Sequence, residues 1–106
     1  MNLSWYWYDI TRQKHNYIDT LDCELKEDNR LVAAKPKSES INNLLEKHRP
    51  GWFCMQDSQE FTNEEPFYVV RLISKESIPG DKVVYFFQIV VESEGINEGT
   101  RYKRGM

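Results

Sequence analysis

Cys54 and His48 are the residues of this 106-residue chain whose types and spacing could support covalent catalysis. A nucleophilic cysteine needs a nearby base or positive field to form its thiolate, and His48 precedes Cys54 across the Pro-Gly pair at 50–51. Cys54, however, lies inside the apolar run "WFCM", where a cysteine behaves as a small hydrophobic residue. His48 equally suits the C-terminal end of a helix. We therefore expect a protein that is not an enzyme, with a thiol enzyme centred on Cys54 and His48 as the remote alternative.

Other reactive or ligand-binding patterns are weak. The two histidines and two cysteines do not have the spacing of a zinc site, and the acidic stretches lack the pattern of a calcium loop. The five glycines form no phosphate-binding loop and no nucleophile elbow. Glu64 and Glu65 are adjacent, so on an extended segment they point to opposite sides and cannot work as a pair. The sequence thus predicts no metal and no cofactor.

The charge of the chain points to a partner class. It carries 17 acidic residues against 14 lysines and arginines, and the acids gather in "DTLDCELKED" (residues 19–28) and "DSQEFTNEE" (residues 57–65). Such a surface repels nucleic-acid phosphates and attracts basic proteins, although an acidic stretch can also be no more than a solvated face. We expect another protein with a basic surface, such as a nuclease, as the partner.

The segment "SWYWYDI" (Ser4–Ile10) places four aromatic residues in succession. In a strand, the two tryptophans share one face with Asp9, and the two tyrosines share the other face with Ile10. Because Ile10 is apolar and Asp9 is charged, we expect the tyrosine face in the core and the tryptophan face outside. The predicted core residues are Tyr6, Tyr8 and Ile10, and the predicted edge or interface residues are Trp5 and Trp7.

Aromatic anchors beside a charged rim are typical of tight protein interfaces. The predicted protein-binding residues are Trp5, Trp7, Asp57, Glu60, Glu64 and Glu65. In size, charge and fold class the chain is similar to small cytosolic proteins that neutralise toxins or nucleases. The sequence thus favours a non-enzymatic protein-binding module, of inhibitor or immunity type, and an edge strand bearing two tryptophans would also allow a homodimer.

The alternative function is an accessory protein that binds nucleic acid. Exposed rings on a sheet can stack unpaired bases, at about 1–3 kcal/mol each, when basic residues guide the backbone. The candidate basic residues are Arg12, Lys14, Arg101, Lys103 and Arg104. This alternative requires the C-terminal bases to fold back beside the first strand.

Hydrophobic periodicity predicts the elements that position these residues. Strands are expected at residues 5–10, 16–26, 31–34, 52–56, 67–74 and 82–92. A helix is expected at about 38–49, capped by Ser38, with an apolar stripe that includes Ile41 and Leu45 and an end at Pro50-Gly51. This order predicts a single α+β domain over residues 1–106: an antiparallel sheet of five or six strands with the helix packed on one face. One helix cannot cover six strands, so the uncovered face must be polar, curled on itself or used as an interface.

The ends of the chain suggest a compartment and a tail. The N-terminal residues do not resemble a secretory signal, and the longest apolar run, "VVYFFQIVV", is too short to span a membrane. With two cysteines outside any CxxC pattern, these features predict a cytoplasmic protein that does not bind membranes. Residues 96–106 lack periodicity, so we expect a flexible basic tail there.

Overall fold

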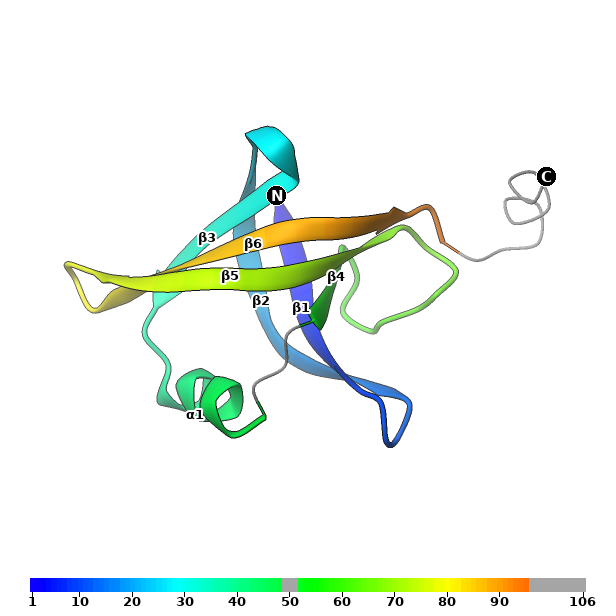
Figure 1. Cartoon of the computed structure of the whole chain (residues 1–106), viewed down its shortest axis with the longest axis horizontal. Coiled ribbons are helices and arrows are strands. Elements are labelled where there is room, and N and C mark those ends of the chain that lie inside the picture. The colour runs from blue at the N-terminus through cyan, green and yellow to red at the C-terminus, as the bar shows by residue number, and fades with distance from the viewer. Residues whose placement is uncertain (49–51, 96–106) are drawn as a thin grey trace.

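Six antiparallel strands of this chain close into a barrel, as a computed structural model shows for residues 1–48 and 52–95 (Figure 1). The elements are β1 (Asn2–Asp9), β2 (Lys14–Lys26), the 3₁₀ turn η1 (Glu27–Asn29), β3 (Arg30–Pro36), α1 (Glu39–His48), β4 (Trp52–Gln56), β5 (Phe67–Ile78) and β6 (Lys82–Ser93). The predicted order of three strands, one helix and three strands is confirmed. The expected tail at 96–106 lies outside the described residues.

The sheet closes because β4 returns to β1. Around the barrel the strands follow the order β1-β2-β3-β6-β5-β4, and β4 pairs with β1 from Ser4 opposite Gln56 to Trp7 opposite Phe53. Three strands joined by short turns, followed by a fourth that lies beside the first, form a Greek key. Closure buries one face of the sheet without a second layer and leaves no free edge on β1 at Ser4–Trp7. A homodimer through the tryptophan-bearing strand would therefore need an edge that this part of β1 does not offer.

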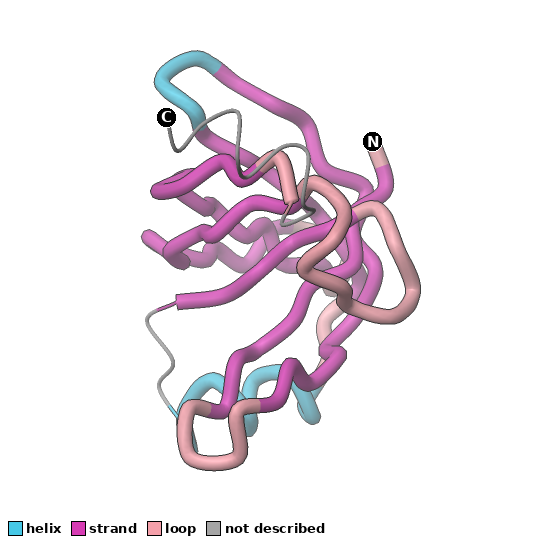
Figure 2. Tube along the Cα trace, turned by 90° about the vertical axis from the view of Figure 1, so that its right-hand side faces the viewer, coloured by secondary structure: helices cyan, strands magenta, loops and turns pink. Residues whose placement is uncertain are grey.

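The helix does not cover a face of the sheet, so that expectation is wrong. It lies between β3 and β4 at one end of the molecule, with η1 at the opposite end (Figure 2). Ile41 is 6% exposed and belongs to the core cluster, and Leu45 packs against that cluster. The Ser38 hydroxyl accepts the Ile41 N–H at 3.3 Å, which is the predicted N-terminal cap. The architecture is accordingly a mostly-β barrel with one short helix.

The interior of the barrel is built around Trp5. This side chain is fully buried, with ring centroids 5.2 Å from Phe53, 5.2 Å from Tyr85 and 5.3 Å from Phe87. Trp7 is half-buried and packs against the same core. The predicted exposure of the tryptophans is thus wrong for Trp5 and holds only in part for Trp7.

The opposite face of β1 points outward. Ile10 is 78% exposed and Tyr8 is 38% exposed, so neither is a core residue. The misleading residue was Asp9, which lies at the end of its strand, where its carboxylate accepts the Thr11 N–H at 3.0 Å and stabilises the turn. A polar residue at a strand end therefore did not identify the solvent-facing side. Tyr6 is buried as predicted, but on the outer wall rather than inside the barrel.

None of the described helical segments is both long and apolar enough to cross a membrane.

Candidate functional site: two clefts beside an acidic loop

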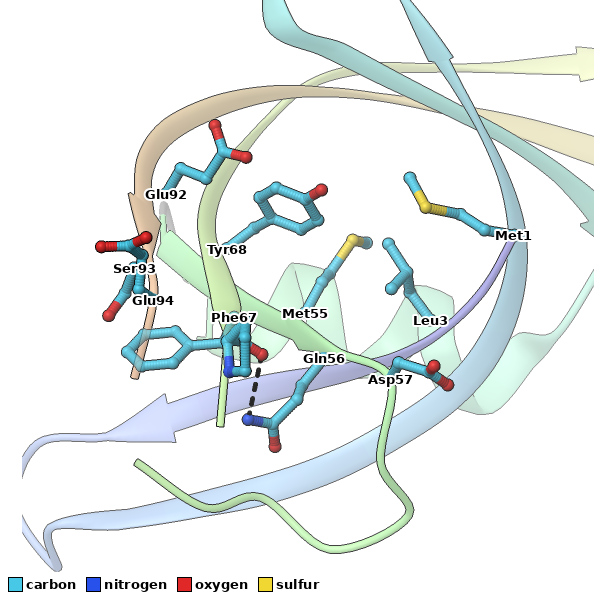
Figure 3. Close-up of a pocket in the computed structure, with 11 residues that line it drawn as sticks. Met1, Leu3, Met55, Gln56, Asp57, Phe67, Tyr68, Glu92, Ser93 and Glu94 are labelled. Atoms are coloured by element: carbon cyan, nitrogen blue, oxygen red, sulfur yellow. Dashed lines mark hydrogen bonds between the residues drawn. The ribbon is translucent and has the colours of Figure 1, made fainter. Parts of the chain in front are cut away.

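Residues 57–66, which we call the acidic loop, are fixed by the side chain of Gln56. Gln56 ends β4 and is 2% exposed. Its Nε2 donates to the carbonyl oxygens of Thr62 at 2.7 Å, Glu65 at 3.2 Å and Pro66 at 3.3 Å, the last shown in Figure 3. Its Oε1 accepts the Thr62 N–H at 3.0 Å. One buried amide at the end of β4 thus holds the middle and the C-terminal end of the loop.

Aromatic side chains hold the same loop to the outer wall. The Tyr6 hydroxyl donates to the Ser58 carbonyl oxygen at 2.7 Å. The Phe61 ring stacks on His15 with centroids 3.6 Å apart, and it also meets Tyr6 edge-on at 5.5 Å. Burial in this cluster lowers the pKa of His15 and raises the pKa of Tyr6, so both stay neutral at pH 7.

Gly95 supports the loop from the end of β6. Its φ of +94° suits glycine, and a Cβ there would lie 2.7 Å from the Glu64 carbonyl oxygen. The backbone of the acidic loop can approach the segment after β6 this closely because Gly95 has no side chain.

The first cleft lies where β1 and β5 begin and β4 and β6 end, and we call it the mouth cleft. It has a volume of about 450 Å³. Figure 3 shows the side chains of Leu3, Met55 and Tyr68 directed toward one another, with Glu92 on one side and Asp57 on the other. Glu94 adds a third carboxylate, and no lysine or arginine lines the cleft among the described residues. An apolar floor with an acidic rim suits an alkyl chain that ends in a cation.

The second cleft lies on the outer wall of the barrel, and we call it the ring cleft. It has a volume of about 360 Å³ and is lined by Tyr8, His15, Trp52, Phe53, Cys54, Asn63 and Val69. Trp52 is 53% exposed, and the Arg71 guanidinium lies 6.0 Å from the centroid of its ring. The ring cleft therefore offers aromatic surface to a ligand.

The structure brings together part of the predicted protein-binding set. Asp57, Glu60, Glu64 and Glu65 are all exposed on the acidic loop. Trp5 is enclosed by the core and is excluded from any contact that leaves the barrel closed. Sequence reasoning missed Glu92 and Glu94 of the mouth cleft and Trp52 of the ring cleft. The alternation in "WFCMQ" carried a signal for Trp52, since it separates Trp52, Cys54 and Gln56 from the buried core face.

The structure describes only some of the basic residues on which the nucleic-acid-binding alternative depends. Arg12 lies in the turn between β1 and β2, and Lys14 begins β2, both exposed. The Arg12 Nε is 3.9 Å from an Asp9 carboxylate oxygen. Arg101, Lys103 and Arg104 lie outside the described residues, and so does the fold-back beside β1 that this alternative requires.

The thiol of Cys54 is in the wrong state for the remote enzymatic alternative. Burial raises its pKa to about 11, whereas a nucleophile needs a lowered pKa. The side chain of His48 lies outside the described part of the structure. No group of three or more histidine, cysteine, aspartate or glutamate residues in the described chain could hold a metal ion.

No protein family, curated protein or solved structure matches this chain. The two clefts and the acidic loop, which contributes residues to both, make up the candidate site.

Proposed function

We propose that this chain is a non-enzymatic protein-binding module, of inhibitor or immunity type, that takes a lysine or arginine side chain of a basic partner into the mouth cleft. The observation that carries the proposal is the combination of an apolar floor with a rim on which every charged side chain among the described lining residues is acidic, while the N-terminal ammonium of Met1 is paired with Asp22.

The chemistry of the two long basic side chains fits both parts of the cleft. Their methylene stems bury against apolar surface while the charged group stays near water. Tyr68 is half-buried and Met1 is exposed, so these two lining residues supply that surface above the buried side chains of Leu3 and Met55. A carboxylate on the rim accepts the short, charge-assisted hydrogen bonds that ammonium and guanidinium groups form. Asp57 and Glu92 are both exposed, so the pairing avoids the large desolvation cost of a fully buried ion pair.

The acidic loop prepares the rest of the surface. Gln56 and Tyr6 already hold its backbone, so binding does not have to order it, and that loss of entropy is avoided. Its four carboxylates would also speed encounter with a basic protein, an effect that salt screens.

The mouth cleft can be tested with a peptide before any partner is known. We expect acetyl-Gly-Arg-Gly-amide to shift the NMR methyl signals of Met55 and Leu3, and the same peptide with neutral citrulline to shift them far less. Glu92→Gln should weaken binding of the arginine peptide by about two- to fivefold, the range for a partly exposed ion pair.

Glu76→Gln is the matched control. It removes the same charge from an exposed site near the β5–β6 turn, at the other end of β5. Equal signal shifts with the arginine and citrulline peptides would show that the cleft does not recognise the charge. Equal loss of peptide affinity in the Glu76 and Glu92 variants would show a general electrostatic effect. Either result would refute the proposal.

A further inference from the structure

The acidic loop lines both the mouth cleft and the ring cleft. The loop contributes Asp57 and Pro66 to the mouth cleft and Asn63 to the ring cleft. A segment that crosses the loop can therefore reach both. Resting on the function proposed above, we infer that the ring cleft receives an aromatic side chain of the same basic partner, so that the partner occupies both clefts that the loop lines.

Strand register explains how the ring cleft forms. Tyr8 on β1 pairs with His15 on β2, and Trp52 on β4 pairs with Arg71 on β5. Trp7 and Phe53 are the last residues that pair β1 with β4, so Tyr8 and Trp52 flank the point where these two strands separate. Cys54 and Val69, also a pair, form the floor one step further along. Neighbouring strands thus present two exposed rings over a small apolar floor.

The residues that line the ring cleft favour an aromatic side chain over a charged one. The Cys54 thiol is buried and neutral, and Val69 is apolar. His15 lies between Tyr8, with centroids 4.7 Å apart, and Phe61, which keeps its neutral ring in the wall. Among the described lining residues there is no aspartate, glutamate, lysine or arginine. A volume of about 360 Å³ is near the lower limit of ligand pockets, which fits one inserted side chain.

Charge decides between a protein ring and a nucleobase. A base stacked here would bring its phosphates close to Glu64, which follows the lining residue Asn63, and to the other carboxylates of the acidic loop. The Arg71 guanidinium beside Trp52 is one cation, not a groove that follows a phosphate backbone. An aromatic residue carried on a basic segment meets the same carboxylates favourably. The occupant that fits both the cleft and its surroundings is therefore an aromatic side chain next to lysine or arginine.

A series of two-armed peptides tests this inference. Each probe has an arginine at one end and a phenylalanine at the other, joined by a Gly-Ser spacer of about two to eight residues. When the spacer matches the distance between the clefts, the second contact becomes intramolecular, and we expect affinity to rise at least about tenfold over a peptide with alanine in place of phenylalanine. The Trp52 indole N–H signal should shift only with the phenylalanine peptides.

Variants separate the two arms. Trp52→Ala and Tyr8→Ala should each remove the gain from phenylalanine while leaving the affinity for acetyl-Gly-Arg-Gly-amide unchanged. Tyr17→Ala is the matched control, because Tyr17 has the same 53% exposure as Trp52 but does not line the ring cleft. It should leave both arms intact.

The outcomes are distinguishable. If the arginine peptide binds but phenylalanine adds no affinity at any spacer length, the ring-cleft inference is wrong and the proposed function stands. If the arginine peptide fails to bind while phenylalanine peptides still shift Trp52, the proposed function fails and, with it, the shared partner. If oligo(dT) shifts Trp52, with an affinity that falls steeply with salt and is lost in Tyr8→Ala, the ring cleft binds bases and the inference is overturned.

Discussion

Replacing Gln56 by leucine tests whether one buried amide sets the shape of the acidic loop. Leucine retains much of the side-chain volume but cannot make the four hydrogen bonds that the amide makes. Loss of the two shortest bonds leaves the Thr62 carbonyl oxygen and the Thr62 N–H without their Gln56 partner. An unsatisfied buried group costs about 1–3 kcal/mol, so a loop that stayed in place would lose about 2–6 kcal/mol.

The loop, however, can open to water. We therefore expect the loss in the free energy of unfolding to stop at about 2 kcal/mol, the point at which opening the loop is easier than keeping it closed. Urea denaturation followed by circular dichroism gives that loss. Hydrogen exchange gives the local effect: the Thr62 amide should lose its protection, while the amides of the barrel interior keep theirs. The variant should also weaken binding of the arginine peptide, because binding must now order the loop. The substitution does not change the charge of the protein, so this loss would not be electrostatic.

Gln88→Leu is the matched control. Its Nε2 donates to the carbonyl oxygens of Asp28 at 2.7 Å and Asn29 at 3.1 Å, so it holds the turn between β2 and β3 in a similar way. Because those contacts are exposed to solvent, we expect a smaller loss of stability, unchanged Thr62 protection and unchanged peptide binding. An unchanged urea midpoint together with full Thr62 protection in Gln56→Leu would refute the reasoning.

Further predictions concern the core, the loop and the buried titratable groups. Gly95→Ala should lower the free energy of unfolding by about 2 kcal/mol or more in a thermal melt, because it combines a left-handed backbone with a contact of 2.7 Å to the Glu64 carbonyl oxygen. Tyr85→Phe should leave the thermal midpoint unchanged or raise it, since the buried Tyr85 hydroxyl has no hydrogen-bond partner in the described structure. Cys54 should react with iodoacetamide at pH 8 about 100-fold more slowly in the native than in the unfolded protein, because burial raises its pKa from 9.0 to about 11. Stability should fall as the pH drops below 6.5, the ordinary pKa of histidine, because the unfolded state binds the His15 proton first and the folded pKa is lowered.

Each of these predictions has a result that contradicts it. An unchanged thermal midpoint in Gly95→Ala would mean that the loop does not approach Gly95 as closely as described. A clear loss of stability in Tyr85→Phe would show that its hydroxyl has a partner, such as a buried water. Alkylation of native Cys54 as fast as in urea would reopen the thiol-enzyme alternative. An unchanged dependence of stability on pH in His15→Phe would exclude burial of His15 as its cause.

Local sequence patterns predicted the elements of this fold but not its closure. The bounds of β4 were predicted correctly from "WFCMQ", and Ser38 correctly marked the start of the helix. Closure depends on β1 pairing with β4, a contact between residues far apart in the chain that periodicity does not encode. The same limit applies to the site. The acidic loop was predictable because its carboxylates are contiguous, whereas the mouth cleft needs the ends of four separate strands.

The closed barrel also constrains the order in which the chain can fold. Its contacts are mostly non-local: Gln88 on β6 meets the turn that precedes β3 across 60 residues, and β1 gains its second neighbour only when β4 is in place. Loops of this size must close before the contacts they allow can stabilise them, so such topologies fold slowly. During synthesis, "SWYWY" leaves the ribosome well before β4, so a strand formed there would have an open edge until β4 arrives. Because charges beside an aromatic strand hinder pairing between chains, we expect the acidic residues that follow in β2 to limit such pairing before the barrel is complete.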